Sequence, residues 1–196
     1  MQDSNGISFY GEIVRKSIHL SNLIIPLSIY LFGPSKVFPY LLVTMFFCIT
    51  MDLLRINNNY FRNIYNKIFG LITRNKESSI FTGATNVMIG ATIVTLLFNE
   101  KAVIPALIIM SVSDTLAAIV GIKLGRTYLA NNKTLEGTFA FFYSSFIILY
   151  FLGIDFSTSI AISFATALSE LFVNIKFIDD NLSIPLIVAS LVSILV

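Results

Sequence analysis

Long apolar runs, separated by short polar segments, dominate the chain. Several of them are close to the length of about 20 residues that an α-helix needs to cross the hydrocarbon core of a bilayer. They cover residues 17–33, 37–54, 80–98, 102–122, 135–152, 157–176 and 182–196, the last being short. The pattern predicts an all-α fold, a polytopic transmembrane helix bundle with about seven membrane segments, built as a single domain over residues 1–196.

The longest segment between these runs, residues 55–79, has an amphipathic pattern. Polar and basic residues such as Arg62 and Lys67 alternate with apolar residues at helical spacing, which are Phe61, Ile64, Tyr65, Ile68 and Ile72. A helix of this kind lies in the plane of the membrane surface with its apolar face inward. We expect one on the cytosolic face, acting either as a basic anchor or as a gate for a lipid substrate.

Prolines mark places where the predicted helices bend or begin. Pro26 falls inside the first apolar run, where its missing N–H predicts a kink. Pro34 and Pro39 are expected to flank the loop between the first two spans. Pro105 and Pro185 lie near helix starts, where a missing N–H costs little.

The composition agrees with an integral membrane protein. Of the 196 residues, 56% are hydrophobic and only 12% are charged, and the mean hydropathy is +0.82. A soluble domain carries about twice that charged fraction. The single Cys48 lies in an apolar run, which leaves no disulfide framework and no cysteine metal site. The polar residues at the start of the chain do not have the pattern of a cleavable signal peptide.

The charges are distributed unevenly between the two sides of the predicted bundle. With the N-terminus in the cytosol, every Lys and Arg except Lys36 and Lys101 falls on the cytosolic side, as the positive-inside rule requires. All acidic residues except Glu100 and Asp155 fall there as well, which that rule does not require. We therefore expect a multi-pass integral membrane protein whose N-terminus and active site face the cytosol. Because the basic residues are scattered and matched by acids, no nucleic-acid partner is expected.

Polar residues share a face at the inner ends of three predicted helices. They are Arg15, His19 and Asn22 in the first, Thr82, Asn86 and Gly90 in the third, and Ser163, Thr166, Glu170 and Asn174 in the sixth. Interhelical hydrogen bonds are a sufficient reason for Asn22, Ser163 and Thr166. The ionisable His19 and Glu170 need charged partners in an apolar setting, so we expect them at a polar site.

Asp114 lies inside the fourth apolar run. Ala118, Gly121 and Gly125 follow it on the same helix face, and Arg126 comes next. The small residues indicate either close helix packing or a backbone that approaches a bound phosphate. In the second interpretation the Asp114 carboxylate holds a divalent cation. Mg²⁺ fits, because it takes one or two carboxylates together with phosphate oxygens and water.

The segment Lys-Thr-Leu-Glu-Gly-Thr, from Lys133 to Thr138, opens the fifth predicted helix. Thr134 is a candidate N-cap, Gly137 leaves the first turn open, and Lys133 adds a positive charge. The free N–H groups of a helix N-terminus bind anions. The segment is therefore either an ordinary capped helix start or a phosphate site, and Glu136 close to hydrocarbon favours the site.

Taken together, these motifs resemble those of a known family. The sequence Ser-Asp-Thr-x-Ala-Ala-x-x-Gly-x-x-x-Gly-Arg from Ser113, followed by Lys-Thr-x-Glu-Gly-Thr, is similar to the CTP-binding region of one kinase family. That family comprises dolichol kinase, phytol kinase and yeast-type diacylglycerol kinase, distant relatives of phosphatidate cytidylyltransferase. Further matches follow in order along the chain: Arg15-Lys16-x-x-His19, Asp52-x-x-Arg55, Glu77, Thr82-Gly83, Glu170, and Asp180-Asn181 before Pro185.

The resemblance implies transfer of the γ-phosphate of CTP to the hydroxyl of a lipid alcohol. That alcohol is either of the polyprenol type (dolichol, phytol, geranylgeraniol) or diacylglycerol. It implies Mg²⁺ or another divalent cation on Asp114 and Glu136, with Glu170 as an alternative second ligand, and His19 or Glu170 as the general base. The implied nucleotide-binding residues are Lys133, Thr134, Gly137, Thr138, Arg126, Gly121, Gly125, Thr82, Gly83, Asp180 and Asn181, although a surface turn explains the last two almost as well.

Other functions fit part of the pattern. A cytidylyltransferase that forms a CDP-lipid from a lipid phosphate would use similar nucleotide contacts, but the longer charged signature typical of those enzymes is missing after Glu170. A small ion-coupled transporter would place its charges near the bilayer midplane, whereas these charges gather toward one face. The chain has neither a Walker motif nor a kinase-type Gly-rich loop, so a soluble-kinase mechanism is not expected. The sequence is compatible with an oligomer and does not select the lipid.

Overall fold

The computed structural model describes residues 9–73, 80–172 and 179–196. These ranges are helical and contain no strand, only an isolated bridge between Tyr128 and Thr134. The all-α prediction is therefore confirmed. The helices are α1 (Phe9–Ser21), α2 (Ile24–Phe32), α3 (Pro34–Asn57), α4 (Asn59–Phe69), α5 (Gly83–Leu97), α6 (Glu100–Leu124), α7 (Leu135–Phe151), α8 (Phe156–Phe172) and α9 (Asp180–Leu195), with a 3₁₀ turn at Ala130–Asn132.

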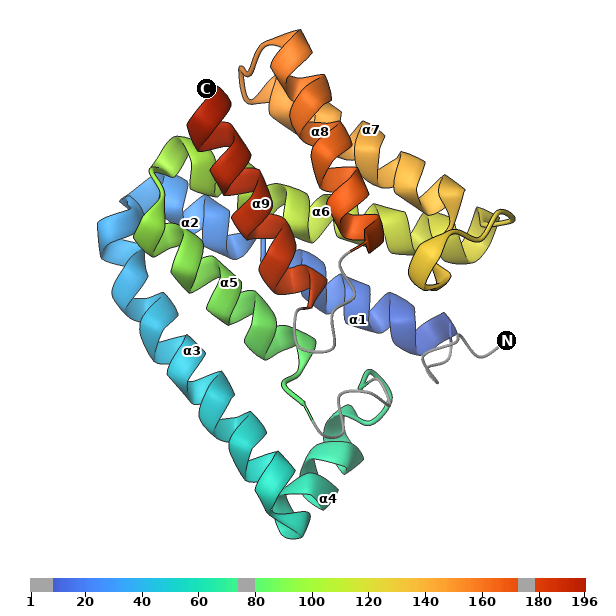
Figure 1. The fold of residues 1–196 in the computed structure, drawn as a ribbon. Coiled ribbons are helices and arrows are strands. Elements are labelled where there is room, and N and C mark those ends of the chain that lie inside the picture. Colours follow the sequence, from blue (N-terminus) through green and yellow to red (C-terminus); the bar gives the residue numbers. More distant parts are fainter. Residues whose placement is uncertain (1–8, 74–79, 173–178) are drawn as a thin grey trace.

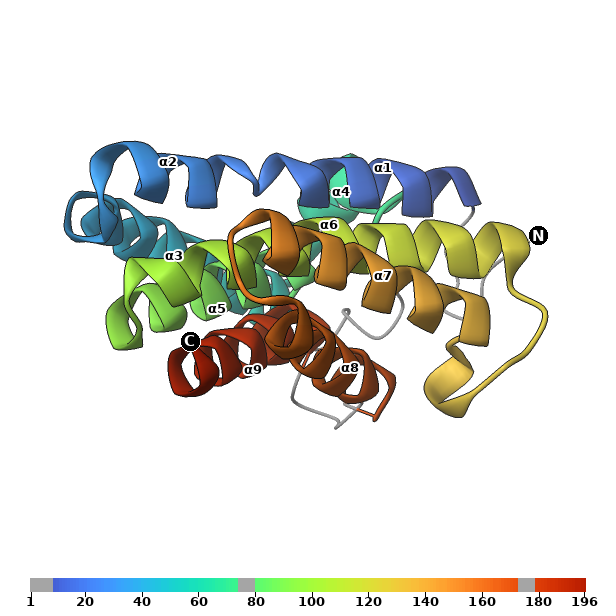
Figure 2. The same ribbon diagram turned by 90° about the horizontal axis from the view of Figure 1, so that it is seen from above.

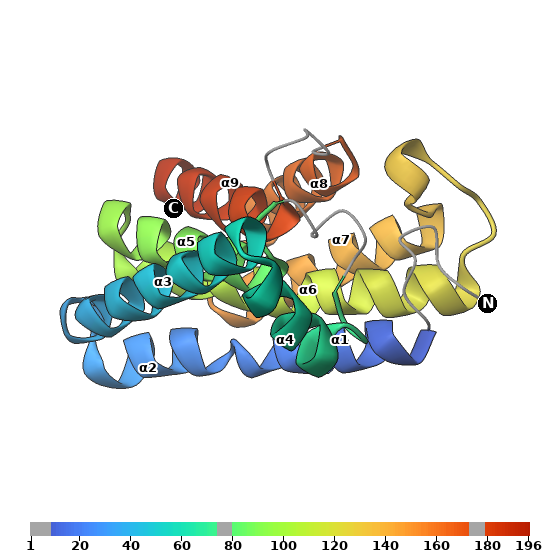
Figure 3. The same ribbon diagram turned by 90° about the horizontal axis from the view of Figure 1, so that it is seen from below.

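Helix α6 is the centre of the bundle (Figure 1). It packs against α1 and α2 on one side and against α7 and α9 on the other, while α8 packs on α7 and α9. Figures 2 and 3 show this layering, with α1 and α2 along one side of α6 and the α8–α9 pair along the other. The fully buried side chains between these layers include Leu107, Met110, Phe141, Ile162 and Val188.

Two helices, α3 and α6, are long and apolar enough to cross a membrane. Helices α5, α7, α8 and α9 are apolar but have only 10–17 residues each, so seven full spans are not confirmed. Large apolar side chains such as Tyr40, Phe46 and Phe47 of α3 are exposed on the outside of the bundle. Exposed apolar surface of this extent needs an apolar environment, which a lipid bilayer provides.

The first predicted run forms two helices. The break falls at Asn22 and Leu23, because Pro26 has no N–H to donate to the Asn22 carbonyl four residues earlier. Ile25 N donates to that carbonyl instead, at 2.9 Å. Helix α1 also begins at Phe9, well before the predicted start, so Arg15 and Lys16 lie in a helix and not in a loop.

The predicted loop around Pro34 and Pro39 is shorter than expected. Gly33, with a φ of +83°, makes the turn alone, and α3 begins directly at Pro34. Pro39 therefore lies inside α3, early enough that its missing N–H affects only the first turns.

Helix α4 corresponds to the predicted amphipathic segment but is shorter. Asn58 caps it by accepting a hydrogen bond from Tyr60 N at 2.8 Å. Its apolar side chains are exposed, among them Phe61, Ile64 and Ile68. Of the predicted range 55–79, residues 55–57 belong to α3 and residues 74–79 lie outside the described residues.

Small residues let α6 and α7 approach closely. A methyl group on Gly137 would lie 2.8 Å from the Ala117 carbonyl oxygen, and one on Gly121 would lie 3.0 Å from the Thr134 hydroxyl. One on Gly125 would lie 2.6 Å from the Thr134 methyl carbon. Of the two interpretations that the sequence allowed for these glycines, the contacts match helix packing.

Helix α9 is held against α5 by a similar contact. A methyl group on Gly90 would lie 2.8 Å from the Asn181 carbonyl oxygen and 3.3 Å from Pro185 Cγ. Pro185 has no N–H to bond to the Asn181 carbonyl within the helix, so that carbonyl faces Gly90 instead. This contact sets the position of the first turn of α9.

The α6–α7 contact gives a test of the glycine interpretation. Gly137→Ala is expected to destabilise the protein by about 1–3 kcal/mol, because the added methyl meets a backbone carbonyl that cannot rotate away. Gly121→Ala should cost less, since only the Thr134 side chain has to move. Thermal unfolding in detergent without nucleotide measures both effects. Unfolding of Gly137→Ala at the wild-type temperature would contradict the packing interpretation.

Candidate functional site

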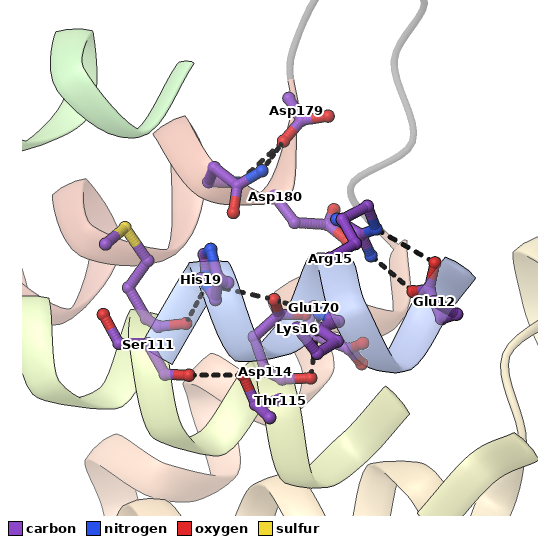
Figure 4. A network of polar contacts seen from close by, with 12 residues as sticks. Glu12, Arg15, Lys16, His19, Ser111, Asp114, Thr115, Glu170, Asp179 and Asp180 are labelled. Atoms are coloured by element: carbon purple, nitrogen blue, oxygen red, sulfur yellow. Dashed lines mark hydrogen bonds and ion pairs between the residues drawn. The ribbon is translucent and has the colours of Figure 1, made fainter. Parts of the chain in front are cut away.

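Asp114 is a buried carboxylate at the contact between α6 and α1. Lys16 Nζ donates to its Oδ2 at 2.5 Å and to its backbone carbonyl at 3.2 Å. His19 Nε2 lies 3.3 Å from the same Oδ2. Asp114 is 8% exposed and Lys16 3% exposed. Figure 4 shows both side chains of α1 pointing to the Asp114 carboxylate.

The hydrogen bonds of His19 define which ring nitrogen is free for chemistry. Nε2 lies 2.9 Å from the Met110 carbonyl oxygen, which can only accept, so Nε2 carries the proton. The neutral ring then accepts at Nδ1. If His19 acts as a general base, the proton must arrive at that nitrogen.

Lys133 is the centre of a second charged cluster, contributed by α8 and α9. Its ammonium donates to Glu170 Oε1 at 2.5 Å, to the Glu170 carbonyl at 2.7 Å and to Asp180 Oδ2 at 2.9 Å. The loop that carries Lys133 is tied to α8 by a hydrogen bond of 3.0 Å from Asn131 Nδ2 to the Leu171 carbonyl.

The charge of Lys133 is preserved by these carboxylates. Burial alone would lower the pKa of the ammonium, but the Asp180 and Glu170 carboxylates outweigh burial and raise its pKa above the ordinary value. Lys133 is therefore charged at neutral pH. Its contribution to stability is complete below the ordinary pKa and is lost only as the pH rises through the higher pKa of the folded state.

The two clusters form one site. Asp114 interacts electrostatically with both Glu170 and Asp180. Figure 4 shows Glu170 and Asp180 next to the α1 residues that contact Asp114. Glu170 is only 5% exposed, and its Oε2 has no hydrogen-bond partner among the described residues. A buried carboxylate oxygen without a partner is costly, which indicates a position for a cation or donor that binds there.

The structure does not bring Glu136 to Asp114. Glu136 Oε2 accepts from Thr127 N at 3.4 Å, beyond the end of α6 at Leu124. Asp114 lies ten residues before that end, about 15 Å along the helix axis. The Glu136 carboxylate is thus engaged near the end of α6 and not at Asp114. Arg126 is exposed at the same end of α6, away from Asp114.

Most residues of the predicted phosphate site, Lys133 to Thr138, make hydrogen bonds or ion pairs within the protein in this conformation. Thr134 caps α7 by accepting from Gly137 N at 3.2 Å, as predicted. The Thr138 hydroxyl donates to the Thr134 carbonyl at 3.1 Å. Lys133 turns away from this helix start toward α8 and α9. The cation and the helix N-terminus are therefore directed to different places.

Two further pairs of predicted nucleotide-binding residues, Asp180-Asn181 and Thr82-Gly83, lie at helix starts. Asp179 caps α9 and accepts from both the backbone N and the side-chain Nδ2 of Asn181, at 3.0 and 2.5 Å, whereas Asp180 points to Lys133. Thr82 caps α5, which begins at Gly83. Of the residues proposed as interhelical hydrogen bonders, Thr166 bonds within its own helix to the Ile162 carbonyl.

Some other predicted residues play no visible part in the site. The Ser163 hydroxyl has no hydrogen-bond partner in the described part of the chain, and Asn22 lies in the break between α1 and α2. Glu77 and Asn174 lie outside the described residues.

A third polar cluster joins α3 to the start of α5. Asp52 Oδ2 accepts from Thr82 N at 2.7 Å, from the Thr82 hydroxyl at 3.0 Å and from the Thr85 hydroxyl at 2.6 Å. Arg55, which is 2% exposed, pairs with Asp52 at 3.0 Å and donates to the Ile80 carbonyl at 2.7 Å. Its guanidinium also lies 5.1 Å from the centre of the Tyr65 ring. The cluster fixes the start of α5.

Lys16 was not predicted as a site residue, although it belongs to the Arg15-Lys16-x-x-His19 motif. Lys16 and His19 are three residues apart, which places them on one helix face. That spacing is the signal in the sequence that could have identified Lys16. Among the described residues, no three His, Cys, Asp or Glu side chains are arranged to hold a metal ion.

Comparisons place the chain in a family of prokaryotic proteins. It is 36% identical over 189 residues to an uncharacterised protein of Rickettsia prowazekii, covering 91% of each chain. It is 34% identical over 186 residues to an uncharacterised protein of Methanocaldococcus jannaschii, covering 93% of each. The chain belongs to the same family as these two proteins. No protein-family model and no solved structure match it.

Two eukaryotic relatives have described activities in their names. The CTP-dependent diacylglycerol kinase 1 of Schizosaccharomyces pombe is 30% identical, and the enzyme of that name from Saccharomyces cerevisiae is 31% identical, each over 135 residues. The matches cover 67% of this chain but only 62% and 47% of the two kinases. The predicted resemblance to yeast-type diacylglycerol kinases is thus confirmed over two thirds of the chain. The relation to dolichol kinase, phytol kinase and cytidylyltransferases stays a prediction.

The pairing of Lys16 with Asp114 can be measured as a coupling free energy. Lys16→Met and Asp114→Asn each remove one member of a buried ion pair, which costs about 3–5 kcal/mol in such pairs. The double variant removes both charges and should lose clearly less than the sum of the two single losses. Thermal unfolding in detergent gives all three values. Lys101→Met, at an exposed position at the start of α6, is the matched control and should unfold like the wild type. Additive single losses would show that the pair is not coupled.

Proposed function

We propose that this protein is a CTP-dependent lipid kinase that transfers the γ-phosphate of CTP to the hydroxyl of a membrane lipid alcohol. One observation carries the proposal. Within an apolar helix bundle, two lysines, a histidine and three carboxylates from α1, α6, α8, α9 and the loop before α7 form two charged clusters, buried or partly buried, that interact electrostatically. The homology to CTP-dependent diacylglycerol kinases supports a role for these charges in phosphoryl transfer from CTP.

Phosphoryl transfer does not require a covalent intermediate with the protein. It requires that donor and acceptor be held in line and that the charge on the phosphate oxygens be neutralised. Lys16 and Lys133 supply two cations, one from α1 and one from the loop before α7. A triphosphate placed between them would have positive charge on both sides.

The carboxylates fit a divalent cation such as Mg²⁺. Mg²⁺ prefers oxygen ligands and retains water and phosphate oxygens, so one or two protein carboxylates suffice. Glu170 and Asp180 share one ammonium, and Asp114 interacts electrostatically with both. Glu170 Oε2 is buried and has no hydrogen-bond partner in the part of the chain that the structure describes. We assign the metal role to Glu170 and Asp180, with Asp114 adjacent, and leave Glu136 out. When bound, the ion would neutralise charge on the phosphates.

The lipid hydroxyl needs an acceptor for its proton or at least an orienting group. His19 presents Nδ1 for this purpose, because Nε2 is committed to the Met110 carbonyl. Glu170 Oε2 is the second candidate. The exposed apolar surfaces of the bundle are suited to contact with the chains of a membrane lipid.

For the acceptor we favour diacylglycerol over dolichol, phytol or geranylgeraniol, because the relatives with named activities are diacylglycerol kinases. We place the site on the cytosolic side of a multi-pass membrane protein, where CTP is present. The distribution of basic residues supports that orientation.

The reaction can be tested directly with CTP labelled at the γ-phosphate. Purified protein with Mg²⁺ and diacylglycerol is expected to place the label on the lipid, and a panel of polyprenol-type alcohols tests the preference. A cytidylyltransferase acting on a lipid phosphate would instead release the label as pyrophosphate. The double variant Lys16→Met/Asp114→Asn, which keeps this pair neutral, is the background control. Absence of labelled lipid with every alcohol would refute the proposal.

The role of Lys133 in nucleotide binding gives a second test. Lys133→Ala removes a charged hydrogen-bond donor to the phosphates and is expected to weaken CTP binding about tenfold or more. Lys101→Ala removes an exposed lysine outside the cluster and should leave CTP affinity unchanged. Calorimetric titration of both variants with CTP and Mg²⁺ measures the difference. Unchanged affinity in Lys133→Ala would remove Lys133 from the phosphate site.

A further inference from the structure

The ammonium of Lys133 is saturated by oxygen acceptors of the protein. A lysine ammonium has three N–H donors, and here it has three acceptors: Glu170 Oε1 at 2.5 Å, the Glu170 carbonyl at 2.7 Å and Asp180 Oδ2 at 2.9 Å. No donor is left for a phosphate in this arrangement. If Lys133 is to bind a nucleotide, it must first leave some of these oxygens.

The three oxygens are of the kind that bind a divalent metal ion. Carboxylate and carbonyl oxygens are the protein ligands of Mg²⁺ and Mn²⁺. Two carboxylates face one ammonium, so the cluster keeps a formal charge of minus one even with Lys133 in place. Glu170 Oε2, buried and without a hydrogen-bond partner among the described residues, belongs to the same carboxylate. The cluster therefore has both the ligands and the charge to accept a stronger cation.

The loop that carries Lys133 is anchored, while the Lys133 side chain is partly exposed. The loop is fixed by Leu129 N, which donates to the Lys133 carbonyl at 2.7 Å, and by the bond from Asn131 to α8. The side chain itself is 23% exposed, so it lies at the border of the cluster and not enclosed in it. The anchored loop keeps the ammonium within reach of the cluster after it rotates.

We propose that Lys133 is an internal substitute for the divalent cation. In the absence of ligands its ammonium occupies the cation position between Glu170 and Asp180. A divalent ion displaces it from these oxygens, and the released ammonium then binds phosphate. The displacement step stands on the Lys133 contacts alone, while its use for phosphate rests on the proposed function. The displacement makes metal binding and nucleotide binding mutually dependent, so that the protein binds the metal weakly when no nucleotide is present.

Direct measurement of metal binding tests the displacement. Mn²⁺ binding to detergent-purified protein is followed by the electron paramagnetic resonance signal of free Mn²⁺, without nucleotide. Lys133→Met removes the competing ammonium and should bind Mn²⁺ about tenfold more tightly than the wild type, or better. Lys133→Arg retains a competing cation and should bind weakly, and Lys101→Met should match the wild type. Adding Glu170→Gln to Lys133→Met should abolish the gain.

A second measurement uses the wild-type chain and tests the displacement of Lys133 even if Lys133→Met does not fold. Acetylation of lysine amines, read by mass spectrometry, reports how freely each amine is exposed. Lys133 should be protected without metal and should react several-fold faster at millimolar Mn²⁺, whereas Lys101 should not change. A static ion pair predicts no change at Lys133. No gain in Mn²⁺ affinity in a folded Lys133→Met, or unchanged acetylation of Lys133, overturns the proposal.

These outcomes are separable from those of the kinase assay. Lipid phosphorylation without metal-dependent release of Lys133 would leave the kinase proposal intact and overturn the substitution. Metal-dependent release without phosphorylation of any lipid alcohol would support the substitution and refute the kinase assignment.

Discussion

Charge compensation inside an apolar bundle is the constraint on which the arrangement of this protein depends. Moving an ion out of water costs several kcal/mol after relaxation, and a partner at hydrogen-bond distance recovers that cost only when the geometry is good. Lys16, Asp114, Lys133 and Glu170 are each buried or nearly so, and each has an oppositely charged partner. Helices α1, α6, α8 and α9 must therefore be aligned so that these charged side chains come together. A bundle held by apolar contacts alone would not specify that alignment.

The remaining helices hold this meeting point in place. The small residues between α6 and α7 bring Thr134 and the Lys133 loop close to α6. Gly90 positions the first turn of α9, and with it Asp180, against α5. Asp52 and Arg55 in turn fix the start of α5 on α3. The Asp52–Arg55 cluster between α3 and α5 is thus connected to the charged cluster around Lys133 through a continuous series of packed helices.

The sequence predicted the helical class and many site residues because both depend on local information. Apolar runs define helices, and an ionised residue in such a run is conspicuous, which singled out Asp114, His19 and Glu170. Lys16 was not assigned to the site because hydropathy places a lysine outside a span, whereas a buried partner on α6 lets it lie inside the bundle. The number of full spans stays a prediction for a related reason, since apolar helices of 10–17 residues have the same pattern.

Spatial pairing was harder to predict than residue identity. Glu136 lies near Lys133 in sequence and resembles a metal ligand, but the helix start directs it to Thr127, at the far end of α6. The partners of Lys133 come instead from α8 and α9, about forty residues later, and no periodicity in the sequence reports such a contact. The glycines of α6 allowed two interpretations until the position of α7 was known.

The contributors to the charged cluster are far apart in the order of synthesis. Helix α1 supplies Lys16 and His19, while Asp180 is in α9, the last helix described. During synthesis, Lys16 and Asp114 can pair as soon as α6 is made, but Lys133 emerges before either of its carboxylates. Until α8 and α9 have been made, Lys133 therefore lacks Glu170 and Asp180, the two carboxylates that pair with it in the folded chain.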